Sequence, residues 1–170
     1  MLSRLSLFVA GLFLMVGLAA CGGNGADAPD AADTADTFDP DTPTTELTID
    51  TVDDQMLYED DRFTVPAGEE ISLTLDNSGT TSPAMVHNVV ILNTMDDEVI
   101  NRVGQAALEA GAPNYIPEDD AILAHTDMAD PGETVSMTFT APSEPGEYRF
   151  ICTYPGHYGV MQGTMVVAEA

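Results

Sequence analysis

Apolar and polar residues alternate in several short runs between residues 45 and 168. Turn-forming segments such as Pro66-Ala67-Gly68 and Asp76-Asn77-Ser78-Gly79 separate these runs. Alternation places apolar side chains on one face of a β-strand, and regular turn signals between strands indicate an antiparallel sandwich or barrel. The apolar positions that we expect in strands are Leu47, Ile49, Phe63, Val65, Ile71, Leu73, Leu75, Val135, Met137, Phe139, Tyr148, Phe150, Cys152 and the stretch 161–167.

One segment follows a different period. Between Asp96 and Ala110 the apolar residues recur at helical spacing. Asp96 and Asp97 suit the start of a helix, and Gly111 suits its end. The pattern therefore predicts a mostly β domain with one short helical insertion.

The N-terminus has the pattern of an export signal. Arg4 is followed by an apolar run from Leu5 to Leu18, which is shorter than the roughly 20 residues that a membrane-spanning helix needs. The boundary Leu18-Ala19-Ala20-Cys21 resembles a bacterial lipoprotein processing site, which implies removal of residues 1–20 and a lipid on Cys21. An uncleaved anchor, or secretion with Cys21 as a spare thiol, are the alternatives.

The composition of residues 21–44 predicts a flexible tether, because the segment is acidic, rich in Gly, Ala and Thr, and has few large apolar residues. Residues 45–170 then form the folded domain. We expect the protein to be exported and lipid-anchored to a membrane, facing the periplasm or the cell exterior.

The 170-residue chain is strongly acidic. It has 29 acidic residues and four basic ones, all four of them arginines. Residues 45–170 carry a net charge of −20, because 23 acids oppose only Arg62, Arg102 and Arg149. Such a charge repels nucleic acid and destabilises a compact fold by self-repulsion. Molar salt screens this repulsion, since the Debye length falls to ~3 Å, so the composition predicts a halophilic acidic protein.

Four side chains point to a metal site. Cys152, His157 and Met161 stand at relative positions 0, 5 and 9, and His87 lies upstream. A thiolate, two imidazoles and a thioether form the donor set of a type 1 copper site, whose axial methionine is a weak ligand. Structural zinc sites prefer several cysteines or Cys/His pairs, and calcium needs oxygen ligands. The set therefore predicts one copper ion per chain.

Residues 45–168 resemble the cupredoxins, and within them the azurin and auracyanin branch. The resemblance is carried by Asp54-Gln55-Met56, His87-Asn88, the stretch from Tyr115 to His125 with Ala124-His125-Thr126, and Cys152-Thr153-Tyr154-Pro155-Gly156-His157. It implies a Greek-key β-sandwich and single-electron transfer between membrane or soluble redox partners, such as cytochromes or membrane electron-transfer complexes.

The resemblance also implies roles for individual residues. It assigns copper binding to His87, Cys152, His157 and Met161, and places Asn88 and Thr153 around these ligands. Asn88 would brace the two ligand loops and donate its backbone N–H to the Cys152 sulfur. His125 matches a position that is not a ligand, so we interpret it as a surface histidine. The residues expected to form an apolar docking patch around His157 are Met56, Met85, Tyr154, Pro155, Tyr158 and Val160.

Two other classes of protein use copper. Copper redox enzymes add histidine-rich copper sites, whereas this chain has three histidines and the first site uses two of them. Copper storage or chaperone proteins carry clustered methionines, whereas those of this chain are scattered. The sequence therefore predicts an electron carrier and no enzyme.

Overall fold

The computed structural model describes residues 39–169, so the predicted signal peptide, Cys21 and most of the tether lie outside the described residues. Within the described part, the chain forms eight strands and one helix. They are β1 Glu46–Asp50, β2 Arg62–Pro66, β3 Glu70–Asp76, β4 Val90–Leu92, α1 Asp97–Ala110, β5 Ile122–His125, β6 Thr134–Thr140, β7 Gly146–Ile151 and β8 Gln162–Ala168.

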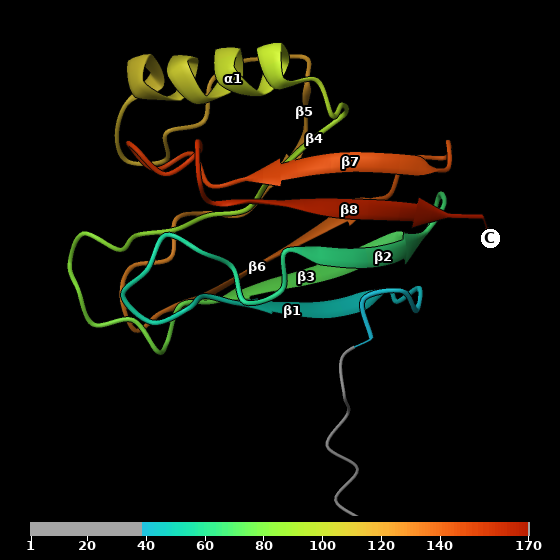
Figure 1. The fold of residues 1–170 in the computed structure, drawn as a ribbon, viewed down its shortest axis with the longest axis horizontal. Coiled ribbons are helices and arrows are strands. Elements are labelled where there is room, and N and C mark those ends of the chain that lie inside the picture. Colours follow the sequence, from blue (N-terminus) through green and yellow to red (C-terminus); the bar gives the residue numbers. More distant parts are fainter. Residues whose placement is uncertain (1–38, 170) are drawn as a thin grey trace, which may run out of the picture. The chain divides into compact units, whose positions relative to one another are not determined.

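The strands form two sheets that pack face to face. One sheet has the order β1-β3-β6 and the other the order β2-β8-β7-β4-β5. Figure 1 shows α1 beside β7 and β8, on the side away from β1 and β3. The predicted β-sandwich with one helical insertion is confirmed.

The main core lies between the two sheets and explains the alternation in the sequence. In β3 the buried residues Ile71, Leu73 and Leu75 alternate with polar ones, and Ile71 pairs with Phe139 across the antiparallel contact with β6. Phe63, Phe150 and Met165 from the second sheet are fully buried in the same core. Each side chain of this size adds about 1.5–3 kcal/mol to stability by leaving water.

The strands are not all antiparallel, which differs from the prediction. Strand β1 runs parallel to β3, and β2 runs parallel to β8. Alternation reports which face of a strand is buried and carries no information about the direction of its neighbour. For this reason the sequence pattern could not distinguish the two arrangements.

Strand β4 was not predicted from the sequence because it is buried on both faces. Val90, Ile91 and Leu92 are all fully buried, so the segment shows no alternation. Ile91 belongs to the core between the sheets, whereas Val90 and Leu92 pack in a second apolar cluster with residues of α1. The helix therefore covers the outer face of the five-stranded sheet.

Helix α1 begins and ends where the sequence predicts. The Asp96 side chain accepts a hydrogen bond from the backbone N–H of Glu98, which caps the first turn. Gly111 adopts a positive φ of 70° and its N–H donates to the Ala107 carbonyl, which closes the last turn. Among residues 39–169, no helix has the length and apolar character needed to cross a membrane.

Candidate metal centre

The loop between β7 and β8 brings three of the predicted ligands together. Cys152 directly follows β7, and Met161 directly precedes β8. The backbone N–H of Cys152 donates to the Met161 carbonyl at 3.0 Å, so the two ends of the loop are held side by side. Within the loop, the His157 carbonyl accepts from the N–H of Val160 at 3.0 Å and of Met161 at 2.8 Å. These bonds make the loop a compact turn with a defined backbone at each predicted ligand.

His87 reaches the same point from another segment. It lies three residues before β4 and forms a bridge with Ala129, in which each backbone N–H donates to the other residue's carbonyl, at 3.1 and 2.7 Å. This paired contact fixes the position of His87 relative to the sheet. Strand pairing between β4 and β7, in which Val90 faces Ile151, then brings His87 next to Cys152.

The three side-chain donor atoms form a small triangle. The Nδ1 atoms of His87 and His157 lie 3.2 Å apart, and the Cys152 Sγ lies 3.9 Å from the first and 3.7 Å from the second. A point equidistant from three such corners lies about 2.1 Å from each, which is close to the 2.0–2.3 Å that first-row metal ions keep from imidazole nitrogen and thiolate sulfur. The residues present therefore fit a single metal ion.

The triangle is buried. His87 and Cys152 are fully buried, and His157 is 4% exposed. Burial, followed by the neighbouring His157, lowers the pKa of His87 to about 4. Burial also lowers the pKa of His157, and it raises the pKa of the Cys152 thiol to about 12. At neutral pH the imidazoles are thus free to bind a metal, whereas Cys152 must release a proton to do so.

Two backbone N–H groups point at the sulfur. Those of Asn88 and Tyr154 donate to Cys152 and partly oppose the effect of burial on its pKa. Such bonds favour the thiolate, which is the form that binds metal.

The Asn88 side chain links the two ligand-bearing segments. Its Oδ1 accepts from the backbone N–H of Thr153 at 2.8 Å, and its Nδ2 donates to the Thr153 hydroxyl at 2.9 Å. Both residues are buried. Asn88 and Thr153, which directly follow His87 and Cys152 in the sequence, are therefore joined to each other by two hydrogen bonds.

Tyr58 supports this link and was missed by the sequence analysis. Its hydroxyl donates to the Asn88 carbonyl at 2.5 Å, and its ring packs at 5.1 Å from the ring of Phe150, two residues before Cys152. Burial, followed by the Cys152 thiolate, raises the pKa of Tyr58 well above its usual value, so the phenol stays neutral. Tyr58 lies two residues after Asp54-Gln55-Met56, a stretch that carries the family resemblance, and this closeness in sequence could have indicated a role for it.

One polar atom beside the site lacks a partner. The Nε2 atom of His87 is buried and has no hydrogen-bond partner within residues 39–169. Metal-binding histidines usually donate from the nitrogen that faces away from the metal. Here the backbone bridge with Ala129 holds the main chain of His87, and the far ring nitrogen makes no such bond within the described residues.

The remaining predicted residues lie in different surroundings. Met161 is fully buried in the core cluster that also contains Cys152. His125 is exposed on β5 and its Nδ1 lies 3.0 Å from its neighbour's carbonyl, so it is a surface histidine. In the predicted docking patch, Val160 is 57% exposed and Met56 is 37% exposed. The others are half-buried: Met85, Tyr154, Pro155 and Tyr158.

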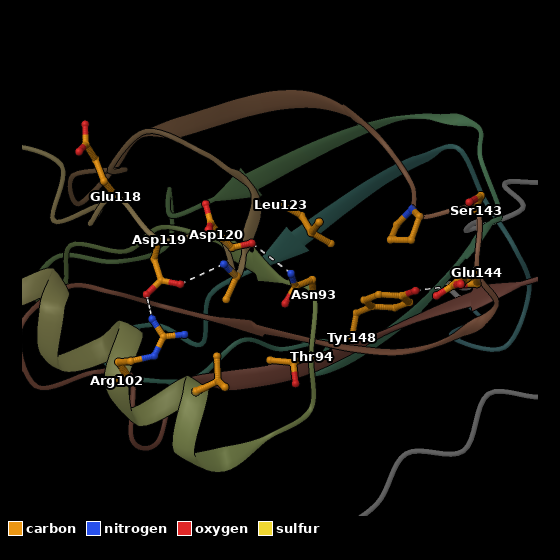
Figure 2. A pocket seen from close by; sticks show the side chains of 13 residues that line it. Asn93, Thr94, Arg102, Glu118, Asp119, Asp120, Leu123, Ser143, Glu144 and Tyr148 are labelled. Atoms are coloured by element: carbon orange, nitrogen blue, oxygen red, sulfur yellow. Dashed lines mark hydrogen bonds and ion pairs between the residues drawn. The ribbon is translucent and has the colours of Figure 1, made fainter.

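A surface hollow elsewhere on the domain does not belong to this site. Figure 2 shows Arg102 of α1 paired with Asp119, Asn93 donating to the Asp120 carbonyl, and Tyr148 donating to the Glu144 carbonyl. The residues that line the hollow include no histidine, cysteine or methionine. It therefore offers no soft ligand for copper.

Asn77 is a second residue that the sequence analysis missed. It is fully buried, and its Nδ2 donates to the carbonyls of Met85 and Ala129, both at 3.0 Å. The sequence Asp76-Asn77-Ser78-Gly79 was interpreted only as a turn, which concealed this contact with the segment that carries His87.

Comparison with known proteins agrees with the geometry. Residues 45–168 match a family described as copper binding proteins, plastocyanin/azurin family. The chain is 39% identical over 152 residues to auracyanin-A of Chloroflexus aurantiacus, which covers 88% of each protein. It is 36% identical over 106 residues to outer membrane protein H.8 of Neisseria meningitidis, covering 61% of this chain and 56% of that protein.

A solved structure has the same fold. Dithionite-reduced auracyanin from the photosynthetic bacterium Roseiflexus castenholzii superposes with a TM-score of 0.69 and 40% sequence identity, covering 75% of this chain and 99% of that one. The fold and the copper-binding class therefore agree with the triangle of donor atoms.

Proposed function

The chain belongs to the copper-binding plastocyanin/azurin family, and from this premise we propose that His87, Cys152, His157 and Met161 hold its copper ion. The observation that carries the proposal is the buried triangle of two imidazole nitrogens and one cysteine sulfur. We propose that the Met161 thioether completes the set, and the support is that Met161 directly precedes β8 and that its carbonyl accepts from the Cys152 N–H, which holds its backbone beside this ligand. The thioether suits copper better than zinc.

The function predicted from the sequence, electron transfer by a type 1 copper centre, agrees with this family. Copper supplies a one-electron couple between Cu(II) and Cu(I). The chain's own residues hold the ligands rigidly, which keeps the geometry similar in both states. Family members of this kind are electron carriers, and we propose that this chain likewise catalyses no reaction of its own.

We expect Met161→Leu to retain copper and to raise the reduction potential. An axial thioether is a weak ligand, and its replacement by an apolar group favours Cu(I). Leu fills a similar volume in the buried position, so the fold should lose less than about 1.5 kcal/mol of stability. Voltammetry and copper analysis of the variant measure both effects. Complete loss of copper would contradict the weak axial role.

Electron exchange is proposed to take place at the patch around His157. His157 is the most exposed of the three triangle residues, and Val160 and Met56 lie exposed in the predicted patch. Small apolar patches with polar surroundings are typical of docking surfaces. The partners would be redox proteins such as cytochromes or membrane electron-transfer complexes, and brief contact at a small interface suits such exchange.

We expect Val160→Glu to slow electron self-exchange by about ten-fold or more while leaving the visible spectrum unchanged. The side chain is more than half exposed, so a carboxylate there remains solvated and does not disturb the fold. On docking, however, it would be desolvated against an apolar surface. Leu123→Glu is a matched control, because Leu123 is 43% exposed on β5 and lies outside the patch. Equal rates in both variants would place the docking surface elsewhere.

We also propose that the protein is exported and held at a membrane by a lipid on Cys21. The support is the processing-site pattern in the sequence, together with similarity to a protein named as an outer membrane protein. A tether over residues 22–44 would keep the domain near membrane-bound partners and raise their effective concentration.

Finally, we expect the melting temperature to rise by about 5 °C or more between low and molar salt. Neighbouring acids disfavour the ionised form of two carboxyl groups in the domain. Burial, followed by Asp76 and Glu59, raises the pKa of Asp50, and burial with three neighbouring acids raises that of Asp60. Salt screens this repulsion. Calorimetry in a salt series gives the measurement, and a flat response would contradict the halophilic interpretation.

A further inference from the structure

The side chain of Tyr158 lies directly against the backbone of helix α1. A Cβ atom added to Gly104 would overlap three carbon atoms of the Tyr158 ring. Gly104 is buried in the middle of α1, and Tyr158 belongs to the loop that carries Cys152, His157 and Met161. Only a residue without a side chain allows this approach between the helix and the loop.

Glycine at position 104 does not stabilise the helix itself. In the interior of a helix it is less favourable than alanine, because it loses more conformational freedom on folding. The other buried residues of the helix are Ile100, Val103 and Ala107, and the first two of them pack in the apolar cluster on the outer face of the five-stranded sheet. The contact with the Tyr158 ring therefore explains why glycine occupies this position.

Tyr158 is joined to the predicted ligands through a short and well-bonded backbone. It directly follows His157, and its carbonyl accepts from Gln162 Nε2 at 2.8 Å. The His157 carbonyl accepts from the N–H of Val160 and Met161. A displacement of the Tyr158 ring would therefore be passed to His157 and Met161 and could not be absorbed by a loose segment.

We propose that Gly104 and Tyr158 are positioning residues for the copper centre, with α1 acting as a support that holds the ligand loop in place. The tyrosine ring occupies the space above Gly104 and joins the cluster of Val90, Leu92 and Ile151 beneath the helix. This inference rests on the proposed copper ligands and adds the element that fixes their geometry. It gives the helical insertion a role at the metal centre.

The test uses the full chain loaded with copper. We expect Gly104→Ala to shift the visible and electron paramagnetic resonance spectra and to speed copper release to a chelator by about ten-fold. Thermal unfolding of the copper-free protein should also shift downwards, although alanine favours a helix. Tyr158→Ala leaves the helix unchanged and should speed release to a similar extent.

The double variant gives the decisive comparison. If the two residues act through one contact, Gly104→Ala combined with Tyr158→Ala should release copper within about two-fold of Tyr158→Ala alone. Rates that multiply would overturn the proposal. Tyr158→Ala also tests it alone if Gly104→Ala does not fold, because an unchanged spectrum and release rate in that variant would overturn it too.

Gly159→Ala is a matched control within the ligand loop. Gly159 has open space around its Cβ position, so alanine there should leave the spectra and copper release unchanged. If Gly159→Ala changed the spectra and the rate of copper release as much as Gly104→Ala does, the proposal would be overturned. The effect would then not depend on the contact between Gly104 and Tyr158. A wild-type protein without a blue copper form would instead contradict the proposed function.

Discussion

Replacement of Cys152 by Ser is expected to abolish the intense blue colour of the copper protein. The colour of a type 1 site comes from charge transfer between thiolate and copper, and Cys152 is the only cysteine within residues 39–169. A serine hydroxyl is a poor ligand for copper, because it does not ionise near neutral pH. Copper affinity should fall by more than the roughly 10–100-fold seen when residues around a metal's ligands are changed.

Visible absorption and copper titration of the purified variant measure this effect. Cys21→Ser is the matched control, since it removes the other of the two cysteines and should leave the colour intact. Thermal unfolding shows whether the variant keeps its fold, because Cys152 is fully buried beside the core. A blue Cys152→Ser protein would disprove the assignment of the thiolate ligand.

The sequence predicted those parts of the fold in which one face of an element is buried. Ile71, Leu73 and Leu75 alternate because β3 has one side in the core, and Asp96 and Gly111 mark the ends of α1 through their capping contacts. Strand β4 has both faces buried and gives no such pattern. The parallel contacts of β1 and β2 depend on tertiary pairing, which no local pattern contains.

The ligand set could be predicted because its chemistry is unusual, whereas the residues around it could not. A cysteine, a histidine and a methionine supply soft ligands from one short loop, and this combination is typical of a copper site. Tyr58, Asn77 and Gly104 act through hydrogen bonds or space that appear only when distant segments meet. Each residue type is common in turns, cores or helices, so its sequence position alone carried little information.

Asn77 is the residue outside the ligand set for which we expect the largest effect on stability. Its side chain makes three hydrogen bonds: Nδ2 donates to the carbonyls of Met85 and Ala129, and Oδ1 accepts from the Thr51 hydroxyl at 2.8 Å. The Ala129 carbonyl also accepts the backbone N–H of His87. Asn77 therefore joins the segment that follows β1 to both segments that hold His87.

We expect Asn77→Ala to reduce the free energy of unfolding by about 2–4 kcal/mol, because the Met85 and Ala129 carbonyls and the Thr51 hydroxyl would each lose one hydrogen bond inside the domain. Denaturant unfolding of the copper-free protein measures this loss. We also expect a shift in the visible spectrum of the copper form, since the backbone of His87 would lose part of its support. The two readouts separate a change in stability from a change at the metal.

Asn93→Ala is the matched control for Asn77→Ala, because it removes the same side chain from an exposed position. Asn93 is exposed and its Nδ2 donates to a single carbonyl, that of Asp120, at 3.1 Å. Water can replace that bond, so the variant should lose at most about 1 kcal/mol and keep the spectrum of the parent protein. If Asn77→Ala were as mild as Asn93→Ala, the buried amide would not hold the His87 segment. The bridge between His87 and Ala129 would then have to maintain the site without it.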